Sequence, residues 1–259
     1  GTVTLTATAG ALTDANGAAN NVAANTLTAG SATGVDLDTT VVNASATVSG
    51  TGGVNLNDAD GAVFTNVTTA NGAITITAGG TSKLVNVVAD GAGSNIIGTI
   101  TAGDLLVDLV NAKQGNVTLT SAGGIYENPD PDIDIAGNTI TLTAVSGIGT
   151  PLEAIEIARQ TVNAATNTGG IFLNGAGPLT LNNLVSGTGN IVVTTAAGDL
   201  ILNQLNSGGG LTLTTPGSIL GVAGNLVTVH GASAFTAGGL IGVSQTAALN
   251  NAINLALNG

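Results

Sequence analysis

The sequence predicts an all-β fold, a right-handed parallel β-helix of about 12 coils. Three observations predict it. Aliphatic residues alternate with threonine in short runs, glycine or asparagine precedes most of these runs, and the runs and the residues before them recur at regular intervals. Only 2% of the 259 residues are aromatic, and the chain has no Cys, Met or Trp. A core of Val, Ile, Leu and Ala suits a narrow interior of nearly constant width.

The alternating runs are short and have the period of a β-strand. Aliphatic side chains would lie on one face and threonine on the other, and helical spacing fits none of these segments. The clearest runs are Val3–Thr6, Ile74–Thr77, Val117–Thr120, Ile140–Thr143 and Leu211–Thr214. Glycine and asparagine tolerate positive φ, so pairs such as Gly115-Asn116 and Gly189-Asn190 predict a corner before the strand.

The runs also recur at long range. Gly1–Thr6 matches Gly115–Thr120, Gly52–Asn57 matches Gly169–Asn174, and a partial third copy begins near Gly210. We therefore expect a single β-helix segment over residues 1–259, with internal repeats at approximately 1–114, 115–209 and 210–259. Strands recur roughly every 18 to 24 residues, which suits one coil of a parallel β-helix. An antiparallel sandwich is the alternative, but two-residue hairpin turns are scarce.

One segment departs from this pattern. Thr150-Pro151-Leu152-Glu153 has the residues of a helix N-terminus, whereas Ile155–Ala158 alternates like a strand. We expect a single helical turn or a bulge, followed by a strand, with Glu153 and Glu156 facing solvent.

Charge and composition exclude several functions. The formal net charge is −12, and the three basic residues, Lys83, Lys113 and Arg159, are too few to neutralise a nucleic-acid backbone. No apolar run approaches the roughly 18 residues that span a bilayer, so membrane insertion is not expected. Without cysteine there is no disulfide framework or thiol catalyst.

The densest acidic segment is the candidate metal site. Asp130, Asp132 and Asp134 alternate along the chain close to Glu127, and carboxylate oxygens are the ligands that calcium prefers. The spacing is not that of an EF-hand loop, so a solvated acidic loop that blocks strand pairing is the alternative. The pairs Asp36/Asp38 and Asp58/Asp60 are interpreted as turn residues, with calcium binding as a further alternative.

No residue is expected to carry catalysis, so the chain is predicted not to be an enzyme. Glycoside hydrolysis needs two carboxylates at a fixed separation, and basic partners and aromatic platforms for sugar are nearly absent. His230, the only histidine, is interpreted as a corner residue. The alternative function is that of a carbohydrate-active β-helix protein, because many polysaccharide lyases and hydrolases are also parallel β-helices.

Two repeated polar features complete the pattern. Pairs such as Thr75/Thr77 and Thr118/Thr120 could align into a flat array like that of an ice-binding protein, although Asn55 and Asn57 would interrupt it. Asparagines at strand ends are expected to form hydrogen-bonded ladders between coils. These asparagines are Asn57, Asn86, Asn174, Asn182, Asn203 and Asn225.

The repeat style is similar to that of a known family. The Gly-Asn-Val/Ile-Thr-Leu-Thr units, with Ala122–Ile125 and Gly147–Glu153, resemble the filamentous-haemagglutinin-like β-helical repeats of bacterial two-partner-secretion exoproteins and giant surface adhesins. The resemblance is clearest over Gly115–Val229 and implies an extracellular location at the bacterial cell surface.

The expected function is therefore structural: a rigid β-solenoid rod for adhesion or for matrix and filament assembly. The sequence begins at Gly1 inside a strand motif and ends at Asn258-Gly259 just after one. We expect end-to-end stacking, either with the rest of a longer chain or with identical copies. A host or matrix carbohydrate or protein is the other expected partner.

Overall fold

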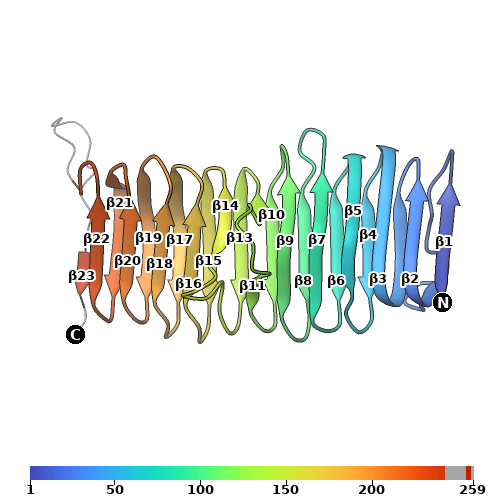
Figure 1. Ribbon diagram of the computed structural model, residues 1–259, viewed down its shortest axis with the longest axis horizontal. Helices are drawn as coiled ribbons and strands as arrows, with labels where there is room; N and C mark the ends of the chain where they lie inside the picture. The colour runs from blue at the N-terminus through green and yellow to red at the C-terminus, as the bar shows by residue number, and fades with distance from the viewer. Residues whose placement is uncertain (243–254, 258–259) are drawn as a thin grey trace. The chain divides into compact units, whose positions relative to one another are not determined.

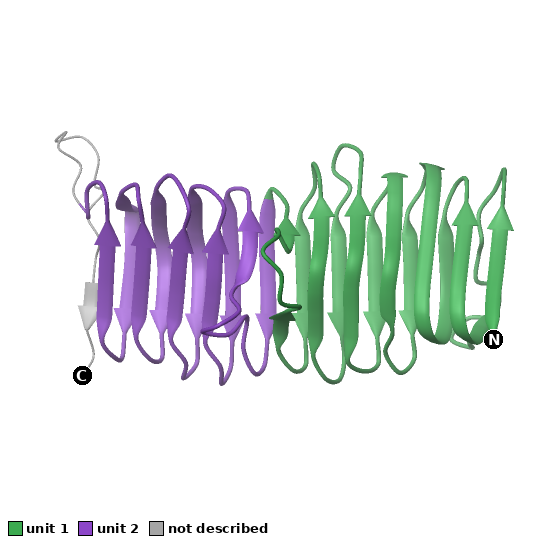
Figure 2. Cartoon of the chain, in the orientation of Figure 1, with its two compact units in different colours: residues 1–138 green, residues 139–259 purple. Residues whose placement is uncertain are grey.

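A computed structural model describes residues 1–242 and 255–257. In these residues every regular element is a β-strand, and no helix is present. The strands are parallel and stack in about 11 turns, so the predicted β-solenoid is confirmed with about one turn fewer than expected. The chain divides into two compact units, Gly1–Asn138 and Thr139–Gly259, which are described separately (Figure 2).

Unit 1 contains strands β1 to β12, and unit 2 contains β13 to β23. The strands of unit 1 are β1 (Thr2–Ala7), β2 (Val22–Ser31), β3 (Val35–Thr51), β4 (Val54–Asp58), β5 (Val63–Asn71), β6 (Ile74–Ala78), β7 (Ser82–Ala89), β8 (Ile96–Ile100), β9 (Leu105–Ala112), β10 (Val117–Ser121), β11 (Ile125–Glu127) and β12 (Ile135–Ala136). The strands of unit 2 are β13 (Thr139–Ala144), β14 (Ile155–Ala158), β15 (Thr161–Thr166), β16 (Ile171–Gly175), β17 (Leu179–Ser186), β18 (Ile191–Thr195), β19 (Leu200–Ser207), β20 (Leu211–Thr215), β21 (Ile219–Val229), β22 (Ser233–Ala237) and β23 (Leu255–Leu257).

Within each unit, strands pair in parallel with the strand one coil further on (Figure 1). In unit 1, Ile74 of β6 pairs with Ile96 of β8, and Ile96 pairs with Val117 of β10. The pairings within unit 2 are also parallel, which overturns the antiparallel alternative. Parallel pairing places equivalent positions of successive coils directly above one another.

Strand β3 is longer than the sequence indicated. Its 17 residues pass around a corner without leaving extended geometry, because Val35–Thr39 pairs with β4 and the segment from Asn43 onward pairs with β5. The sequence runs suggested strands of about four to six residues, since alternation of apolar and polar residues is lost at a corner.

The core of each unit consists of aliphatic columns. In unit 1, Val54, Ile74, Ile96 and Val117 lie one above another, and none is more than 2% exposed. Burial of one such side chain contributes about 1.5–3 kcal/mol. The composition is therefore explained within each unit by a narrow interior lined almost entirely by aliphatic side chains, with Phe64 of unit 1 as the one buried aromatic side chain among the described residues.

Buried hydroxyl groups form a corner motif that was not predicted from the sequence. Thr69 in unit 1, and Thr166, Ser186 and Ser207 in unit 2, each donate a hydrogen bond to the carbonyl oxygen of the glycine three residues later. The buried hydroxyl thus finds its hydrogen-bond partner in a carbonyl group of its own turn. The signal in the sequence is Thr or Ser followed after two residues by Gly.

Asparagine side chains link successive coils, as expected. In unit 2, Asn182 Nδ2 donates to Asn163 Oδ1 at 2.8 Å, and Asn203 Nδ2 donates to Asn182 Oδ1 at 2.9 Å. In unit 1, Asn86 Nδ2 donates to Asn66 Oδ1 at 2.6 Å. The remaining asparagines bond differently: Asn57 and Asn174 donate to Asp38 and Glu156 of the preceding coil, and Asn225 donates to the Val222 carbonyl of its own turn.

The aspartate pairs of unit 1 occupy two environments. Asp58 is 1% exposed at the end of β4, where Oδ2 accepts from Thr39 Oγ1 and the Val41 amide and Oδ1 accepts from the Gly61 amide. This confirms the predicted turn role. Asp36 and Asp38 instead lie within β3, so that prediction was wrong for them. Their outward carboxylates extend the ladders of the strand face by accepting from asparagine amides one coil further on.

The segment that resembled a helix start contains no helix. Residues 151–153 form a bend, and β14 follows, as expected. The Glu153 amide still donates to Thr150 Oγ1 at 3.0 Å, so the capping hydrogen bond forms at a turn that returns directly to a strand. Glu153 and Glu156 are both half-buried and do not face solvent fully. For the described residues, no helix is long and apolar enough to cross a membrane.

Replacement of Ser207 by alanine is expected to destabilise the solenoid by about 1 kcal/mol, because the buried hydroxyl and its hydrogen bond to the Gly210 carbonyl are lost, and that carbonyl keeps only the Ile191 amide as a donor. Ser207→Thr is the matched control, since Thr166 occupies the same column and makes the same bond. The midpoint of urea unfolding measures both. Equal midpoints for Ser207→Ala and the unmodified chain would contradict the assignment.

Candidate functional site

The acidic segment predicted as a metal site is a loop in unit 1. This acidic loop, residues 128–134, joins β11 to β12, and both strands pair with β9. Its two ends are fixed to that strand: the Asn128 amide donates to the Val107 carbonyl at 3.1 Å, and the Val110 amide donates to the Asp134 carbonyl at 2.7 Å. The loop therefore departs from a strand position and returns to it within one coil.

The three predicted ligands do not share one environment. Asp130 and Asp132 are exposed, whereas Asp134 is fully buried. Asp130 Oδ1 accepts from the Asp132 amide at 2.8 Å, and Glu127 Oε1 accepts from the Asp130 amide at 3.1 Å. These hydrogen bonds hold the exposed part of the loop in a defined turn.

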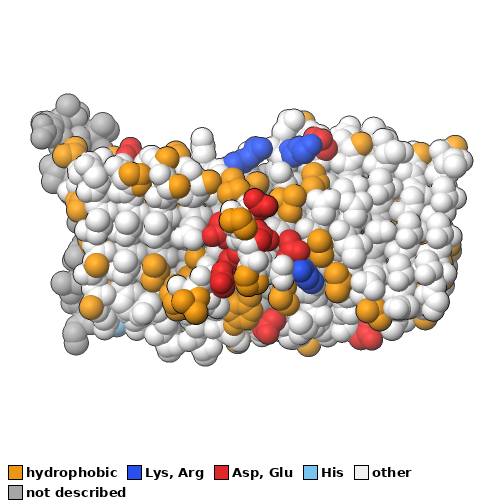
Figure 3. All heavy atoms as spheres, in the orientation of Figure 1, with side chains coloured by type: hydrophobic (Ala, Val, Ile, Leu, Met, Phe, Trp, Pro, Cys, Tyr) orange, Lys and Arg blue, Asp and Glu red, His pale blue; other side chains and the backbone are white. Residues whose placement is uncertain are grey.

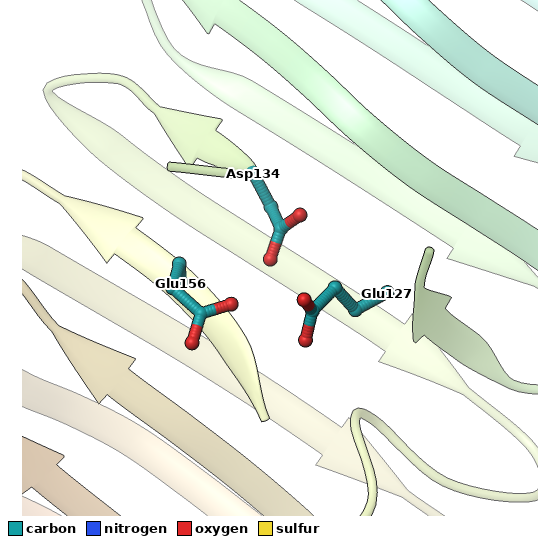
Figure 4. Close-up of side chains that lie close together, drawn as sticks. All are labelled: Glu127, Asp134 and Glu156. Atoms are coloured by element: carbon teal, nitrogen blue, oxygen red, sulfur yellow. The ribbon is translucent and has the colours of Figure 1, made fainter. Parts of the chain in front are cut away.

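The structure brings Asp134 close to Glu127, the neighbouring residue noted in the sequence. Carboxylate oxygens of the two residues lie within 4.8 Å of one another, and Glu127 is 6% exposed (Figure 4). Carboxylate oxygens at this separation are suited to a hard cation such as calcium, which stays a prediction for this loop. Figure 4 also labels Glu156, which belongs to β14 of unit 2; its Oε1 accepts from Asn174 Nδ2 at 2.9 Å.

The two lysines of the chain pair with aspartates of unit 1. Lys83 Nζ lies 3.0 Å from Asp108 Oδ2, joining β7 to β9, and Lys113 Nζ lies 2.8 Å from Asp90 Oδ2. The hydrogen bond from Lys113 lowers the pKa of Asp90 below its usual value. The Lys113–Asp90 pair is exposed and contributes little to stability, whereas the Lys83–Asp108 pair is half-buried; both pairs connect successive coils. Figure 3 shows charged side chains, most of them acidic, gathered in one part of the drawn face, which is largely uncharged elsewhere.

Tyr126 of β11 is the one tyrosine, and it lies on the outer face of unit 1. Its ring covers Gly124, where an added Cβ would lie 2.1 Å from Tyr126 Cζ, so any larger residue at this position would displace the ring. Burial and, to a smaller extent, the charge of Asp104 raise the pKa of Tyr126 above its ordinary value of 10.0. Asp104 is fixed in turn, because its Oδ1 accepts from the Gly124 amide at 2.7 Å.

The histidine of unit 2 is at a corner, as predicted. His230 is exposed, and its ring Nδ1 lies 3.0 Å from the Ser207 carbonyl oxygen. Because a carbonyl oxygen only accepts, Nδ1 carries the proton in this contact. This bond connects successive coils, which is a structural role.

The threonine pairs of unit 1 share a face with other residues. The two outward columns on this face are Asp36-Asn55-Thr75-Ile97-Thr118 and Asp38-Asn57-Thr77-Thr99-Thr120. Three threonines in a row are found in the second column, whereas Ile97 interrupts the first column and is 43% exposed. The interruption predicted at Asn55 and Asn57 is confirmed, so the threonine array on this face is short.

No protein-family model, curated protein or solved structure matches the chain.

A single tyrosine makes its ionisation directly measurable by ultraviolet absorbance titration. We expect a midpoint above 10.0 for Tyr126, and a lower midpoint in Asp104→Asn, which keeps the acceptor for the Gly124 amide but removes the charge. A raised phenol pKa stabilises the fold below pH 10.0, and this contribution is lost as the pH rises through the folded value.

Asp108→Asn is the matched control for this titration, because it removes a carboxylate that does not contribute to the shift at Tyr126. A midpoint at or below 10.0 in the unmodified chain, or equal changes in both variants, would refute the assignment.

Proposed function

We propose that this chain is a structural segment of an extracellular fibre or adhesin at the bacterial cell surface. In this proposal it is a rigid β-solenoid without catalytic function, used for adhesion or for filament assembly. The observation that carries the proposal is the continuous connection between coils within each unit. Backbone pairing, aliphatic columns and asparagine ladders all run along the direction of stacking.

The composition of the outer surface supports the same role. Many outward strand positions are occupied by Thr and Asn, which bond between coils without charge, as Thr68 Oγ1 does to Thr47 Oγ1 at 3.3 Å. Such bonds add resistance to separation of the coils. A surface of this kind remains hydrated while presenting the same chemistry over successive coils.

End-to-end stacking is part of the proposal, and β1 is the strand that supports it. Among the described residues β1 pairs only with β2. Its inward side chains Val3 and Leu5 are half-buried, whereas their partners Leu27 and Ala29 on β2 are at most 2% exposed. One further parallel strand would bury the exposed part of Val3 and Leu5 and pair the free backbone groups.

The edge of the first part of β3, by contrast, already has hydrogen-bond partners within the chain. The Asn21 amide donates to the Asp38 carbonyl at 2.7 Å, and the Asp38 amide donates to Asn21 Oδ1 at 2.6 Å. Asn21 thus replaces a strand on the first part of β3. An incoming coil, from an identical copy or from another part of a longer chain, would therefore add at β1. The predicted stacking end at Asn258-Gly259 lies outside the described residues.

Replacement of Leu5 by lysine tests the stacking. We expect the unmodified chain to form end-to-end assemblies as its concentration is raised, and Leu5→Lys to remain monomeric, because an inward charge at an open edge prevents strand addition. Electron microscopy and light scattering after gel filtration measure the assemblies.

Thr4→Lys is the matched control, since Thr4 is on the same strand and faces outward. It should assemble like the unmodified chain. A monomeric unmodified chain at all concentrations, or equal loss of assembly in both variants, would reject stacking at β1.

A further inference from the structure

An uncharged groove on the outer surface of unit 2 lies across β17, β19 and β21. It has a volume of about 200 Å³ and is lined by Asn183, Gln204, Leu205, Asn206, Leu226 and Thr228. This volume corresponds to roughly six or seven water molecules. A single six-membered sugar ring is an occupant of that size.

The groove exists because β21 departs from the regular coil. Leu202 of β19 pairs with Gly221, but Gln204 pairs with Leu226, so residues 222–225 form a bulge opposite Asn203. Gly224 turns this bulge with a φ of +77°, and Asn225 Nδ2 fixes it by donating to the Val222 carbonyl at 2.6 Å. The bulge is a built feature, held by a side chain that is 2% exposed.

Gln204 is oriented by the bulge and by the asparagine ladder. Its Nε2 donates to the Gly224 carbonyl at 3.2 Å and lies 3.5 Å from Asn203 Oδ1. Both Nε2 hydrogens are thus directed at protein acceptors, which leaves Oε1 as the group available to a ligand. The amide is positioned before any ligand binds, which lowers the entropic cost of binding.

Two further amides complete the polar part of the groove. Asn183 is in register with Gln204 on the adjacent strand, so their Cα atoms are about 4.8 Å apart, and Asn206 is two residues beyond Gln204 on the same face. Asn183 and Asn206 are exposed and can both donate and accept hydrogen bonds. A set of donors and acceptors at this spacing matches the hydroxyl groups around one sugar ring.

Leu226 supplies an apolar surface beside the amides. It follows Gln204 on the next coil and is 46% exposed. None of the lining residues is charged, which favours a neutral ligand over a uronic or sialic acid. We propose that this groove binds one ring of a neutral carbohydrate. The inference rests on the proposed role in adhesion, for which it supplies a ligand class.

Saturation-transfer NMR and calorimetry on the full chain test the inference, with glucose, galactose and N-acetylglucosamine as probes and glucuronate as the charged comparison. We expect at least one neutral sugar to bind and glucuronate to bind more weakly. Asn183→Ala and Asn206→Ala should each weaken binding about five- to tenfold, the effect of one lost hydrogen bond.

Asn167→Ala is the matched control, because Asn167 is an exposed amide of unit 2 outside the groove. Circular dichroism verifies that each variant keeps its strands. Absence of binding by all three neutral sugars, tighter binding of glucuronate, or an equal effect of Asn167→Ala would overturn the groove assignment. None of these results affects the stacking measured with Leu5→Lys, so the two proposals fail separately.

Discussion

Parallel pairing in register between successive coils is the constraint from which the other features follow. Strands about 4.8 Å apart place each residue over its equivalent, so each side chain must pack against or hydrogen-bond to the equivalent side chain one coil away. Aliphatic residues satisfy this inside, and amides and hydroxyls satisfy it at the corners. Where coils approach most closely no side chain fits: a Cβ on Gly169 would lie 1.4 Å from the Ser146 carbonyl oxygen. The glycine content is therefore a packing requirement at such corners.

The fold could be predicted because this constraint leaves a local trace. Period-two alternation and a glycine before the strand are visible within six residues, as at Gly115–Thr120. The acidic loop was visible as a charge cluster, but the burial of Asp134 and exposure of Asp130 were not. Burial there depends on pairing of β12 with β9, a contact between segments more than twenty residues apart, which the local pattern does not encode. The predicted turn role of Asp36 and Asp38 was wrong for the same reason, because their place inside β3 depends on pairing with β4, which the local pattern does not encode either.

Charge is distributed unevenly between the units. Unit 1 holds 12 of the 15 acidic residues and two of the three basic ones, whereas unit 2 holds only Glu153, Glu156, Asp199 and Arg159 together with His230. Some of these charges are structural, since Asp58 is buried and accepts three close hydrogen bonds. Unit 2 consequently relies on amides and hydroxyls for its polar contacts. A net charge of −12 is thus mainly a property of unit 1.

A solenoid of uniform coils has flat outer faces, because every outward position repeats at the same height. A concave surface therefore requires a coil that departs from its neighbours. In unit 2 residues 222–225 of β21, which lie opposite the single residue Asn203, provide that departure, and the inward residues on either side, Gly221 and Val227, stay buried. The interior tolerates the insertion because residues 222–224 lie toward the outer surface. The buried side chain of Asn225 donates to the Val222 carbonyl and so holds the bulge by a hydrogen bond within it. In such a fold a binding surface can thus be formed by a bulge within a strand, which alters the outer surface without disturbing the aliphatic columns.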